Sequence, residues 1–398
     1  MLCEYPIRRL GDLTVNFDGK RVPVKEADRA RGPYPYYGAS GIVDCVDAYL
    51  FDGEYLLIAE DGENLRTRQT PIAFMAKGRF WVNNHAHVVQ ANGGNSTRYL
   101  MYALLAANVH AFLSGSTLPK LTQNAMNQIP VPSPDERTQR AIACILGALD
   151  DKIELNRKMN QTLEGIARAI FKSWFVDFLP VCAKAEGRDP GLPSEIADLF
   201  PSSFVDSELG PIPEGWGVST FGNAAEVSSG KRPTVRYEVP SEMASVPLWG
   251  GNGPMAYVPA PLVDYPALLT GRVGTLGSVF RINSPCWPSD NTLVLRARRS
   301  RSLEYLYFQL LLVDFPSLNR GSTQPLLTQS DLKAQSMPMP PDRVLGRFHD
   351  VAKYLFQRTD ASDSESHTLV SLRDTLLPKL ISGELRVPDA ERIVGRCV

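Results

Sequence analysis

The nine residues GSTLPKLTQ, from Gly115 to Gln123, return 206 residues later as GSTQPLLTQ, from Gly321 to Gln329. Seven of the nine positions are identical, which chance does not explain in a chain of 398 residues. Similarity at a fixed offset is the sequence signature of a repeated structural unit. The two stretches therefore predict that the chain contains two copies of one domain.

Further pairs of segments match around the repeated nine residues. Their offsets lie between 206 and 212, a drift that small loop insertions produce. The matched pairs are 10–21 with 221–232, 35–41 with 247–253, 56–62 with 268–274, 99–105 with 305–311, and 129–132 with 337–340. The matches place one copy at 1–133 and the other at 214–341.

Each copy has the pattern of a mixed α/β domain. Short apolar runs alternate with Gly, Asn and Asp turns, which is typical of strands. The segments 99–105 and 305–311 follow Ser96 and Ser302, two good N-cap residues, and predict one buried helix per copy. Thr328 and Asp331 have the spacing of a capping box, so a second short helix should begin inside the repeated stretch.

The composition changes after each copy. Residues 135–175 contain no proline and only two glycines, and their four-three alternation indicates a coiled-coil seam. The seam consists of Ile142, Leu146, Leu149, Ile153, Asn156, Asn160, Leu163, Ala167, Ile170 and Trp174, and its two asparagines can fix the register. The second copy is followed by Phe348, Ala352, Leu355, Leu369, Leu372 and Leu376, with a polar middle.

A helix of about 40 residues is ~60 Å long, and so narrow an apolar stripe does not stabilise it alone. We therefore expect the two helices to pair with each other. The predicted fold class is α+β, with two repeated mixed α/β domains and two long helices. Its parts are a domain at 1–133, a helix at 134–180, a Pro-, Gly- and acid-rich linker at 181–213, a domain at 214–341, and a helix with a tail at 342–398.

The bulk composition favours a soluble cytoplasmic protein. No run of about 18 apolar residues occurs, and the N-terminus has no signal-peptide h-region, so we expect neither a membrane span nor secretion. The six cysteines include no C-x-x-C pair, so reduced thiols are expected. A formal net charge of -1 gives no whole-molecule argument for nucleic-acid binding, which local clusters or a partner would have to supply.

Five segments together resemble the specificity subunits of type I restriction-modification systems. They are YYGASGIVDCVDAYLFDGEYLLIAEDG (36–62), WVNNHAHVV (81–89), GSTLPKLTQNAMNQIPVPSPDERTQRAI (115–142), LGPIPEGW (209–216) and DTLLPKLISGEL (374–385). The resemblance implies two target-recognition domains that each read half of a split double-stranded DNA sequence. It also implies that the two helices form an antiparallel coiled coil, which spaces the domains and docks two modification (methyltransferase) subunits.

The same resemblance implies that this chain carries out no chemistry and needs no cofactor. Methyl transfer and ATP-driven cleavage would belong to the modification and restriction subunits. The residues agree with this interpretation, because the chain has no G-x-x-x-x-G-K-[ST] stretch for ATP phosphates and no Asp-Pro-Pro-Tyr or Asn-Pro-Pro-Tyr stretch.

Two related domains that read different sequences should share their phosphate contacts and differ where bases are read. Lys20, Arg21, Lys231 and Arg232 recur at matched positions and are candidates for phosphate contacts. The candidates for base contacts are the polar loop residues that differ, namely Ser40 against Asn252, Glu60 against Arg272, and Asn64, Arg66 and Arg68 in the first copy alone. Arg298 stands in a run with Arg296, Arg299 and Arg301 that could hold the DNA backbone. For each of these residues the alternative is an ordinary solvated surface position.

Two other patterns resemble chemical sites, but we interpret them as structural. His85 and His87 have a spacing that suits a metal site, but Asn291 and Leu293 occupy the matched positions. Glu60 and Asp61 could form a catalytic carboxylate pair, yet their matches are Arg272 and Val273, so the shared scaffold does not require them. We predict neither a metal site nor a catalytic residue.

Four aromatic residues, Phe171, Trp174, Phe175 and Phe178, lie within eight positions at the end of the first helix. A two-helix seam does not bury so many, so some should meet a recognition domain or a partner. Two alternatives to DNA reading stay open from the residues alone. One is an enzyme, such as a nuclease or glycosidase, built on a duplicated domain, and the other is a protein-interaction scaffold.

Overall fold

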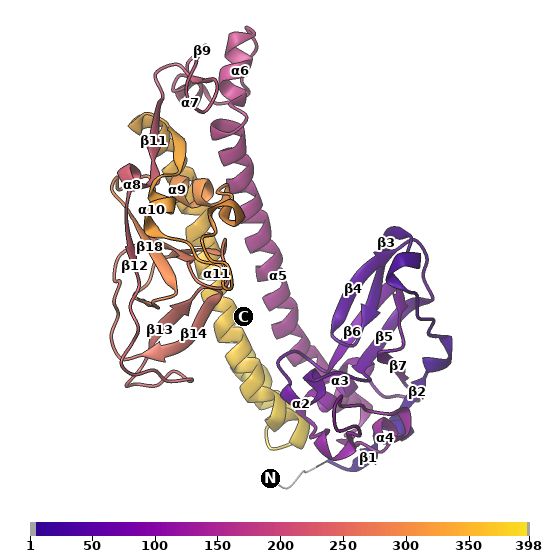
Figure 1. The fold of residues 1–398 in the computed structure, drawn as a ribbon. Helices are drawn as coiled ribbons and strands as arrows, with labels where there is room; N and C mark the ends of the chain where they lie inside the picture. Colours follow the sequence, from indigo (N-terminus) through magenta and orange to yellow (C-terminus); the bar gives the residue numbers. More distant parts are fainter. Residues whose placement is uncertain (1–4, 396–398) are drawn as a thin grey trace. The chain divides into compact units, whose positions relative to one another are not determined.

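The computed structural model describes residues 5–395, which divide into two compact units (Figure 1). Unit 1 comprises Met1–Arg157 and Asp363–Val398, and unit 2 comprises Lys158–Ser362. Both long helices cross the border between the units, because α5 runs over Glu136–Phe175 and α11 over Asp342–Ser382. Each unit therefore contains one copy of the domain and a part of each long helix.

Unit 1 is built on a six-stranded sheet with the order β2-β7-β5-β6-β3-β4 and a separate β1-β8 pair. Its strands are β1 (Ile7–Arg9), β2 (Thr14–Asn16), β3 (Arg31–Gly38), β4 (Gly41–Val46), β5 (Phe51–Ala59), β6 (Ala73–Val82), β7 (Ala86–Ala91) and β8 (Pro130–Pro132). Its helices, besides α5 and α11, are α1 (Leu10–Leu13), α2 (Asn64–Thr67), α3 (Thr97–Ala106), α4 (Gln123–Asn127), α12 (Val387–Val394) and the 3-10 turns η1 (Asp18–Lys20), η2 (Glu26–Asp28) and η3 (His110–Phe112).

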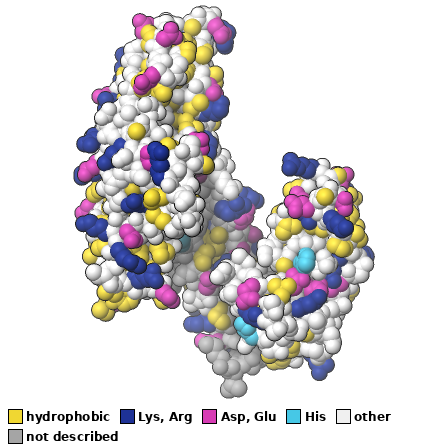
Figure 2. All heavy atoms as spheres, in the orientation of Figure 1, with side chains coloured by type: hydrophobic (Ala, Val, Ile, Leu, Met, Phe, Trp, Pro, Cys, Tyr) yellow, Lys and Arg dark blue, Asp and Glu magenta, His cyan; other side chains and the backbone are white. Residues whose placement is uncertain are grey.

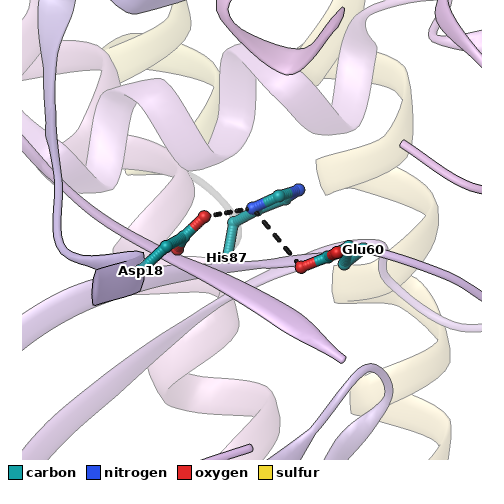
Figure 3. A group of neighbouring side chains, drawn as sticks. All are labelled: Asp18, Glu60 and His87. Carbon is teal, nitrogen blue, oxygen red and sulfur yellow. Dashed lines mark hydrogen bonds and ion pairs between the residues drawn. The ribbon is translucent and has the colours of Figure 1, made fainter. Parts of the chain in front are cut away.

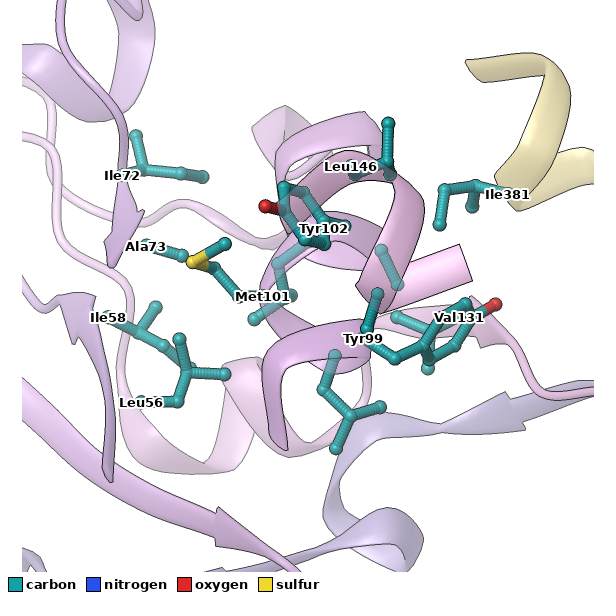
Figure 4. Packing of buried hydrophobic residues seen from close by; sticks show 14 of the residues in the cluster. Leu56, Ile58, Ile72, Ala73, Tyr99, Met101, Tyr102, Val131, Leu146 and Ile381 are labelled. Atoms are coloured by element: carbon teal, nitrogen blue, oxygen red, sulfur yellow. The ribbon is translucent and has the colours of Figure 1, made fainter. Parts of the chain in front are cut away.

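The central strand β5 is covered on both faces. Because side chains alternate along a strand, Leu56 and Ile58 pack with α3 and the long helices, whereas Leu57 joins an aromatic cluster on the other face. Figure 4 shows Leu56 and Ile58 beside Met101 of α3, in the same core as residues of α5 and α11. The first repeated domain and the helix pair thus share one core in unit 1.

Unit 2 repeats the arrangement with a divided sheet. Its strands form the orders β12-β18-β15-β16 and β14-β13-β17, with the pairs β11-β19 and β9-β10. They are β9 (Phe204–Val205), β10 (Ile212–Pro213), β11 (Gly217–Thr220), β12 (Ala225–Ser229), β13 (Val246–Gly250), β14 (Gly253–Val258), β15 (Ala267–Gly271), β16 (Val279–Ile282), β17 (Trp287–Pro288), β18 (Thr292–Ala297) and β19 (Ser336–Met339). The helices are α6 (Leu179–Ala185), α7 (Ser194–Ala197), α8 (Phe221–Ala224), α9 (Leu303–Leu311), η4 (Phe315–Leu318) and α10 (Gln329–Lys333).

Matched strands pair alike in the two copies. Tyr36 of β3 pairs in parallel with Trp81 of β6, and Leu248 of β13 pairs in parallel with Trp287 of β17. The sheet of unit 2 is divided because Pro285 stands where unit 1 has Arg79, inside the continuous strand β6. Proline donates no ladder hydrogen bond, so β16 ends before it and β17 begins after it.

The long helices pair antiparallel, as the resemblance implied. In unit 1, Asp150 of α5 contacts Arg373 of α11. Further along α5, Asn156 donates at 2.7 Å to Glu365, which precedes Arg373 in α11, so the two helices run in opposite directions. In unit 2, the end of α5 packs around Phe348, near the start of α11. The seam asparagine Asn156 is fully buried and contacts the facing helix, as a residue that fixes the register should.

Phe171, Trp174 and Phe175 of α5 lie in the core of unit 2, and Phe178, just after α5, packs against it, which confirms that some of the four aromatic residues meet the second repeated domain. Phe171 stacks on Phe308 of α9 at 5.0 Å between ring centroids, and Phe175 meets Tyr305 at 5.0 Å. The segment predicted as a linker also packs here, because Val181, Ile196, Phe200 and Ile212 belong to the same cluster.

The three predicted helix starts are right, but their capping hydrogen bonds form to different extents. The Ser96 hydroxyl accepts a hydrogen bond from the Tyr99 amide, which confirms that cap. Thr328 accepts from the Asp331 amide, but the Asp331 carboxylate accepts from the Thr328 hydroxyl, so the box is half formed. Ser302 is the N-cap residue of α9, as predicted, but its hydroxyl donates to the Arg299 carbonyl at 2.9 Å and makes no cap bond.

Cys45, Cys144, Cys182 and Cys286 are free thiols, as expected, while Cys3 and Cys397 lie outside the described residues. Over residues 5–395, no helix combines the length and the apolar character that crossing a membrane requires.

Candidate nucleic-acid interface

Arg21, predicted to contact phosphate, lies folded into unit 1. Its guanidinium donates to Glu60 at 2.7 Å and to the Ala86 carbonyl at 2.8 Å, and it pairs with Asp18 at 3.3 Å. Its side chain is only 13% exposed. An arginine guanidinium presents five N–H donors. In Arg21 these donors face Glu60, Asp18 and the Ala86 carbonyl, which leaves few of them for a ligand.

His87 of β7 lies beside the same carboxylates and contacts the repeated stretch. Its Nδ1 is 2.5 Å from Asp18 and 3.8 Å from Glu60 (Figure 3). Its Nε2 is 2.8 Å from the Leu121 carbonyl. Both ring nitrogens thus lie within hydrogen-bonding distance of oxygen atoms. Lys120 of the repeated stretch adds an ion pair with Glu60 at 3.2 Å. We call Asp18, Arg21, Glu60, His87 and Lys120 the charged cluster of unit 1.

The electrostatics of the charged cluster favour ionised carboxylates. Burial alone would raise the pKa of the Asp18 carboxyl, but the hydrogen bond and the positive charge of His87 bring that pKa below its ordinary value. Burial likewise opposes ionisation of Glu60, yet hydrogen bonds from Arg21 and Lys120, together with the charge of His87, lower its pKa.

The charged cluster contains residue types that bind metal ions, but the cations beside them disfavour a metal site. Ligand atoms of Asp18, Glu60 and His87 lie within 4.8 Å of one another. The cations Arg21 and Lys120 already neutralise the two carboxylates, so a divalent ion would have to displace them. His85 does not join this group, since its Nδ1 pairs with Asp61 at 2.8 Å near the surface.

In unit 2 the matched positions carry different chemistry. Glu60 and Arg272 are equivalent in the backbone, because their amides bond the carbonyls of His85 and Asn291, and their carbonyls accept from Leu121 and Leu327. The Arg272 side chain donates to the Ser229 hydroxyl at 3.0 Å. The place of the charged cluster is therefore occupied in unit 2 by an arginine and a hydroxyl.

The matched pairs Lys20-Arg21 and Lys231-Arg232 are equivalent in sequence but not in structure. Trp81 donates its indole N–H to the Val22 carbonyl, whereas its match Trp287 donates to the Lys231 carbonyl. Arg21 therefore precedes this anchor and turns inward, while Arg232 follows it and is exposed. Lys20 is exposed as well, with its ammonium 5.3 Å from the centre of the Phe17 ring.

Three further candidates brace loops of unit 1. Asn64 exchanges two hydrogen bonds with the backbone of Thr70, and Arg66 donates to the Gly115 carbonyl at 2.9 Å. Arg68 donates to the carbonyls of Leu105 and Ala107 at the end of α3, where helix carbonyls lack internal partners. These bonds also hold Arg68 in a left-handed conformation with φ 51°, which a non-glycine residue adopts at a cost.

The arginine run in unit 2 mostly tethers the domain to α11. Arg299 pairs with Asp342, and Arg301 donates to the Gly346 carbonyl and pairs with Asp350. Arg296 lies 4.4 Å from the centre of the Tyr265 ring. Arg298 is exposed and has no side-chain partner among residues 5–395, so it alone in the run is available to an outside ligand.

The remaining base-contact candidates lie at two matched hairpin turns. Ser40, between β3 and β4, and Asn252, between β13 and β14, are both exposed. Asn252 borders a hollow of about 320 Å³ with Asn291 and Thr275, and Arg232 borders an adjoining hollow of about 380 Å³ with Arg236 and Asn291. The side chains of Asn291 and Arg236 were not predicted, although Asn291 is the match of His85 and could have been found by that comparison.

Sequence reasoning also missed Asp18, His87 and Lys120 as one group. Their only signal was that the matched residues Ser229, Leu293 and Leu326 lack charge. Over the face in Figure 2, acidic and basic side chains are interspersed on both units, without a broad basic patch.

Comparisons with known proteins agree with this architecture. The sequence model of a family described as the type I restriction modification DNA specificity domain matches residues 4–165 and 213–362. The chain is 25% identical to the type I restriction enzyme MjaIX specificity subunit of Methanocaldococcus jannaschii, over 97% of this chain and 94% of that protein. It is 24% identical to the HindI specificity subunit of Haemophilus influenzae, over 84% of each. A crystal structure of a type I restriction-modification S subunit from M. genitalium shares the fold, with a TM-score of 0.65 and 16% identity over 95% of this chain and 96% of that one.

Proposed function

Because the chain belongs to the family of type I restriction-modification DNA specificity proteins and carries two copies of the family's domain, we propose that it reads a bipartite target in double-stranded DNA. Each recognition domain would read one half of the target. The paired helices would set the distance between the halves. The phosphate contacts would fix each domain on the duplex, and the base contacts would select the sequence.

The observation that carries the proposal is that a shared framework presents different side chains at the same places. The two copies keep the same parallel strand pair and the same loop hydrogen bonds. At matched loop positions, however, His85 of unit 1 corresponds to Asn291 of unit 2, and Ser40 corresponds to Asn252. Side chains of these kinds discriminate base edges in the major groove.

The proposal assigns the catalytic steps to partner subunits. Two modification subunits would dock on the long helices, and restriction subunits would join them. Exposed apolar residues on α5 and α11 support docking, because Leu155, Ile166 and Tyr354 are 59%, 43% and 72% exposed. The carboxylates of Asp18 and Glu60 are held in internal ion pairs, which supports a binding role and not an enzymatic one.

The test is to express the chain with its modification subunit and to map the methylated sites in the host. We expect one split sequence with a non-specific spacer. In a second strain, residues 1–133 are replaced by the first domain of another family member, and only one half of the sequence should change. A folded chimera that changed both halves, or a wild-type complex without any specific site, would contradict the proposal.

A further inference from the structure

Two adjoining hollows open on the surface of unit 2 beside the β13–β14 hairpin. The first, of about 320 Å³, is bordered by Gly250–Met255, the loop from Val273 to Thr275, and Asn291. The second, of about 380 Å³, shares Met255 and Asn291 with the first. Because these two residues border both, the hollows form one continuous surface, which we call the asparagine hollow. Volumes of this order suit a small ligand or the edge of a base.

The polar groups of the asparagine hollow are available to a ligand. Asn252, Asn291 and Arg232 are all exposed, and their side chains have no hydrogen-bond or ionic partner in the described part of the chain. Arg236 borders the same surface and adds a second guanidinium, while Asp290 adds one carboxylate. In unit 1, by contrast, the matching Arg21 pairs with Glu60 and the matching His85 pairs with Asp61, whereas Ser40, the match of Asn252, is exposed.

Glycines shape the first hollow by letting backbone segments approach closely. A Cβ on Gly271 would lie 2.2 Å from the Thr275 carbonyl oxygen, so no other residue fits there without moving the loop. The matched residue in unit 1 is Ala59, which has a Cβ. The loop from Val273 to Thr275 can therefore fold back on Gly271 only in unit 2, which leaves space in front of Asn252 and Asn291.

In unit 1, a paired histidine and aspartate occupy the positions that match Asn291 and Val273 of the hollow. His85 corresponds to Asn291, and Asp61 corresponds to Val273. His85 and Asp61 pair at 2.8 Å, and Ile42 and Val43 of the matched hairpin are 58% and 55% exposed. The two domains thus present unlike chemistry at one place of the shared framework, with free amides in unit 2 and a charged pair beside apolar side chains in unit 1.

We propose that the asparagine hollow is the base-reading site of unit 2, in which Asn291, assisted by Asn252, recognises the major-groove edge of an adenine while Arg232 holds a neighbouring phosphate. An asparagine amide can bond adenine N6 and N7 together, and arginine suits phosphate geometry. This inference rests on the proposed function. It adds that the two domains hold DNA unequally, since Arg232 is free and its sequence match Arg21 is internal.

The experiment measures duplex binding by the complex of the full chain with its modification subunit. The probe is a duplex that carries the site mapped for the wild type, together with versions changed at single base pairs. Asn291→Ala should lower discrimination at one A·T pair of the second half-site by roughly 5- to 150-fold. Arg232→Ala should weaken binding to all duplexes and reduce the salt slope by about one. The double variant V273D/N291H, which transplants the unit 1 pair, should abolish the adenine preference.

The chain supplies matched controls. Arg21→Ala should leave the salt slope unchanged, and Asn223→Ala, an exposed asparagine outside the hollow, should leave discrimination unchanged. Hydrogen exchange confirms that each variant is folded. If the wild-type complex selects a split site but N291A and R232A behave like wild type, the hollow is not the reading site and the proposed function stands. If the wild-type complex selects no site, the proposed function itself fails.

Discussion

His87 is a fully buried side chain in the charged cluster of unit 1, with oxygen acceptors at both ring nitrogens. Removing one partner of a buried ion pair costs ~3–5 kcal/mol, because the other charge stays buried without compensation. In this cluster Arg21 still pairs with Asp18, so the cost should be smaller.

We predict that His87→Leu, which installs the residue of unit 2, lowers the stability of unit 1 by about 2–4 kcal/mol. The measurement is hydrogen exchange of the β7 amides in the full chain, since a two-unit protein does not give one global unfolding free energy. The control is His85→Asn, also the unit 2 residue, where an exposed pair contributes only ~0–1 kcal/mol. Equal effects of the two substitutions would refute the special role of His87.

The carboxylates of the charged cluster also predict a pH dependence. The pKa values of Asp18 and Glu60 are lowered in the folded state. Their stabilisation is complete above the unfolded pKa values of about 4 and is lost as the pH falls through the folded values. Protection of the β7 amides should therefore decrease below about pH 4. The double variant D18N/E60Q should flatten this decrease, and an unchanged acid profile would show that the cluster does not couple to folding.

At the scale of elements, the sequence predicted those helices and caps that depend on the local pattern of residues. The four-three alternation identified both long helices, and the Ser96 cap formed as expected. Ser302 stands at the N-cap but makes no cap bond, because its hydroxyl donates to the Arg299 carbonyl three residues earlier, a local alternative with which serine competes against capping. Lys20-Arg21 and Lys231-Arg232 match in sequence but are not equivalent in structure, because the tryptophan anchor falls on different residues.

Two tethers between domain and helix use one design that no sequence comparison revealed. Arg98 donates to the Gly147 carbonyl and pairs with Asp151 of α5, as Arg301 does with Gly346 and Asp350 of α11. The arginines occupy different places in the sequence alignment, so only the structure shows their common role. The glycines allow the close approach, since a Cβ on Gly147 would lie 2.5 Å from the Arg98 guanidinium carbon.

The tether predicts opposite effects for two alanine substitutions in α5. Gly165→Ala, with nothing near its Cβ, should stabilise the helix by about 0.5–1 kcal/mol. Gly147→Ala gains the same propensity but displaces Arg98 and its bonds, so we expect no net gain or a loss of about 1 kcal/mol. Hydrogen exchange of the α5 amides around each site checks both. A full gain at Gly147 would show that the Arg98 tether contributes nothing.

At the scale of the whole molecule, the duplication divides the chain into units that each hold a core of their own. Each core includes part of α5 and part of α11, so neither recognition domain folds against its own helix alone. A helix that belongs to both cores fixes the number of residues between them. If each domain reads half of a split site, this number should appear in the DNA as the length of the spacer.

We therefore predict that one heptad inserted into each helix, after Arg157 in α5 and before Asp363 in α11, lengthens the spacer and leaves both half-sites unchanged. A heptad preserves the seam and adds ~10 Å at 1.5 Å per residue, which is about three base pairs at ~3.4 Å each. Methylation mapping of the variant measures the spacer directly. A seven-residue insertion in the turn from Gly187 to Gly191, outside the helices, is the control and should not alter it. If the heptad variant methylates the original spacing with both halves still read, the partner subunits and not the helices determine the distance between the domains.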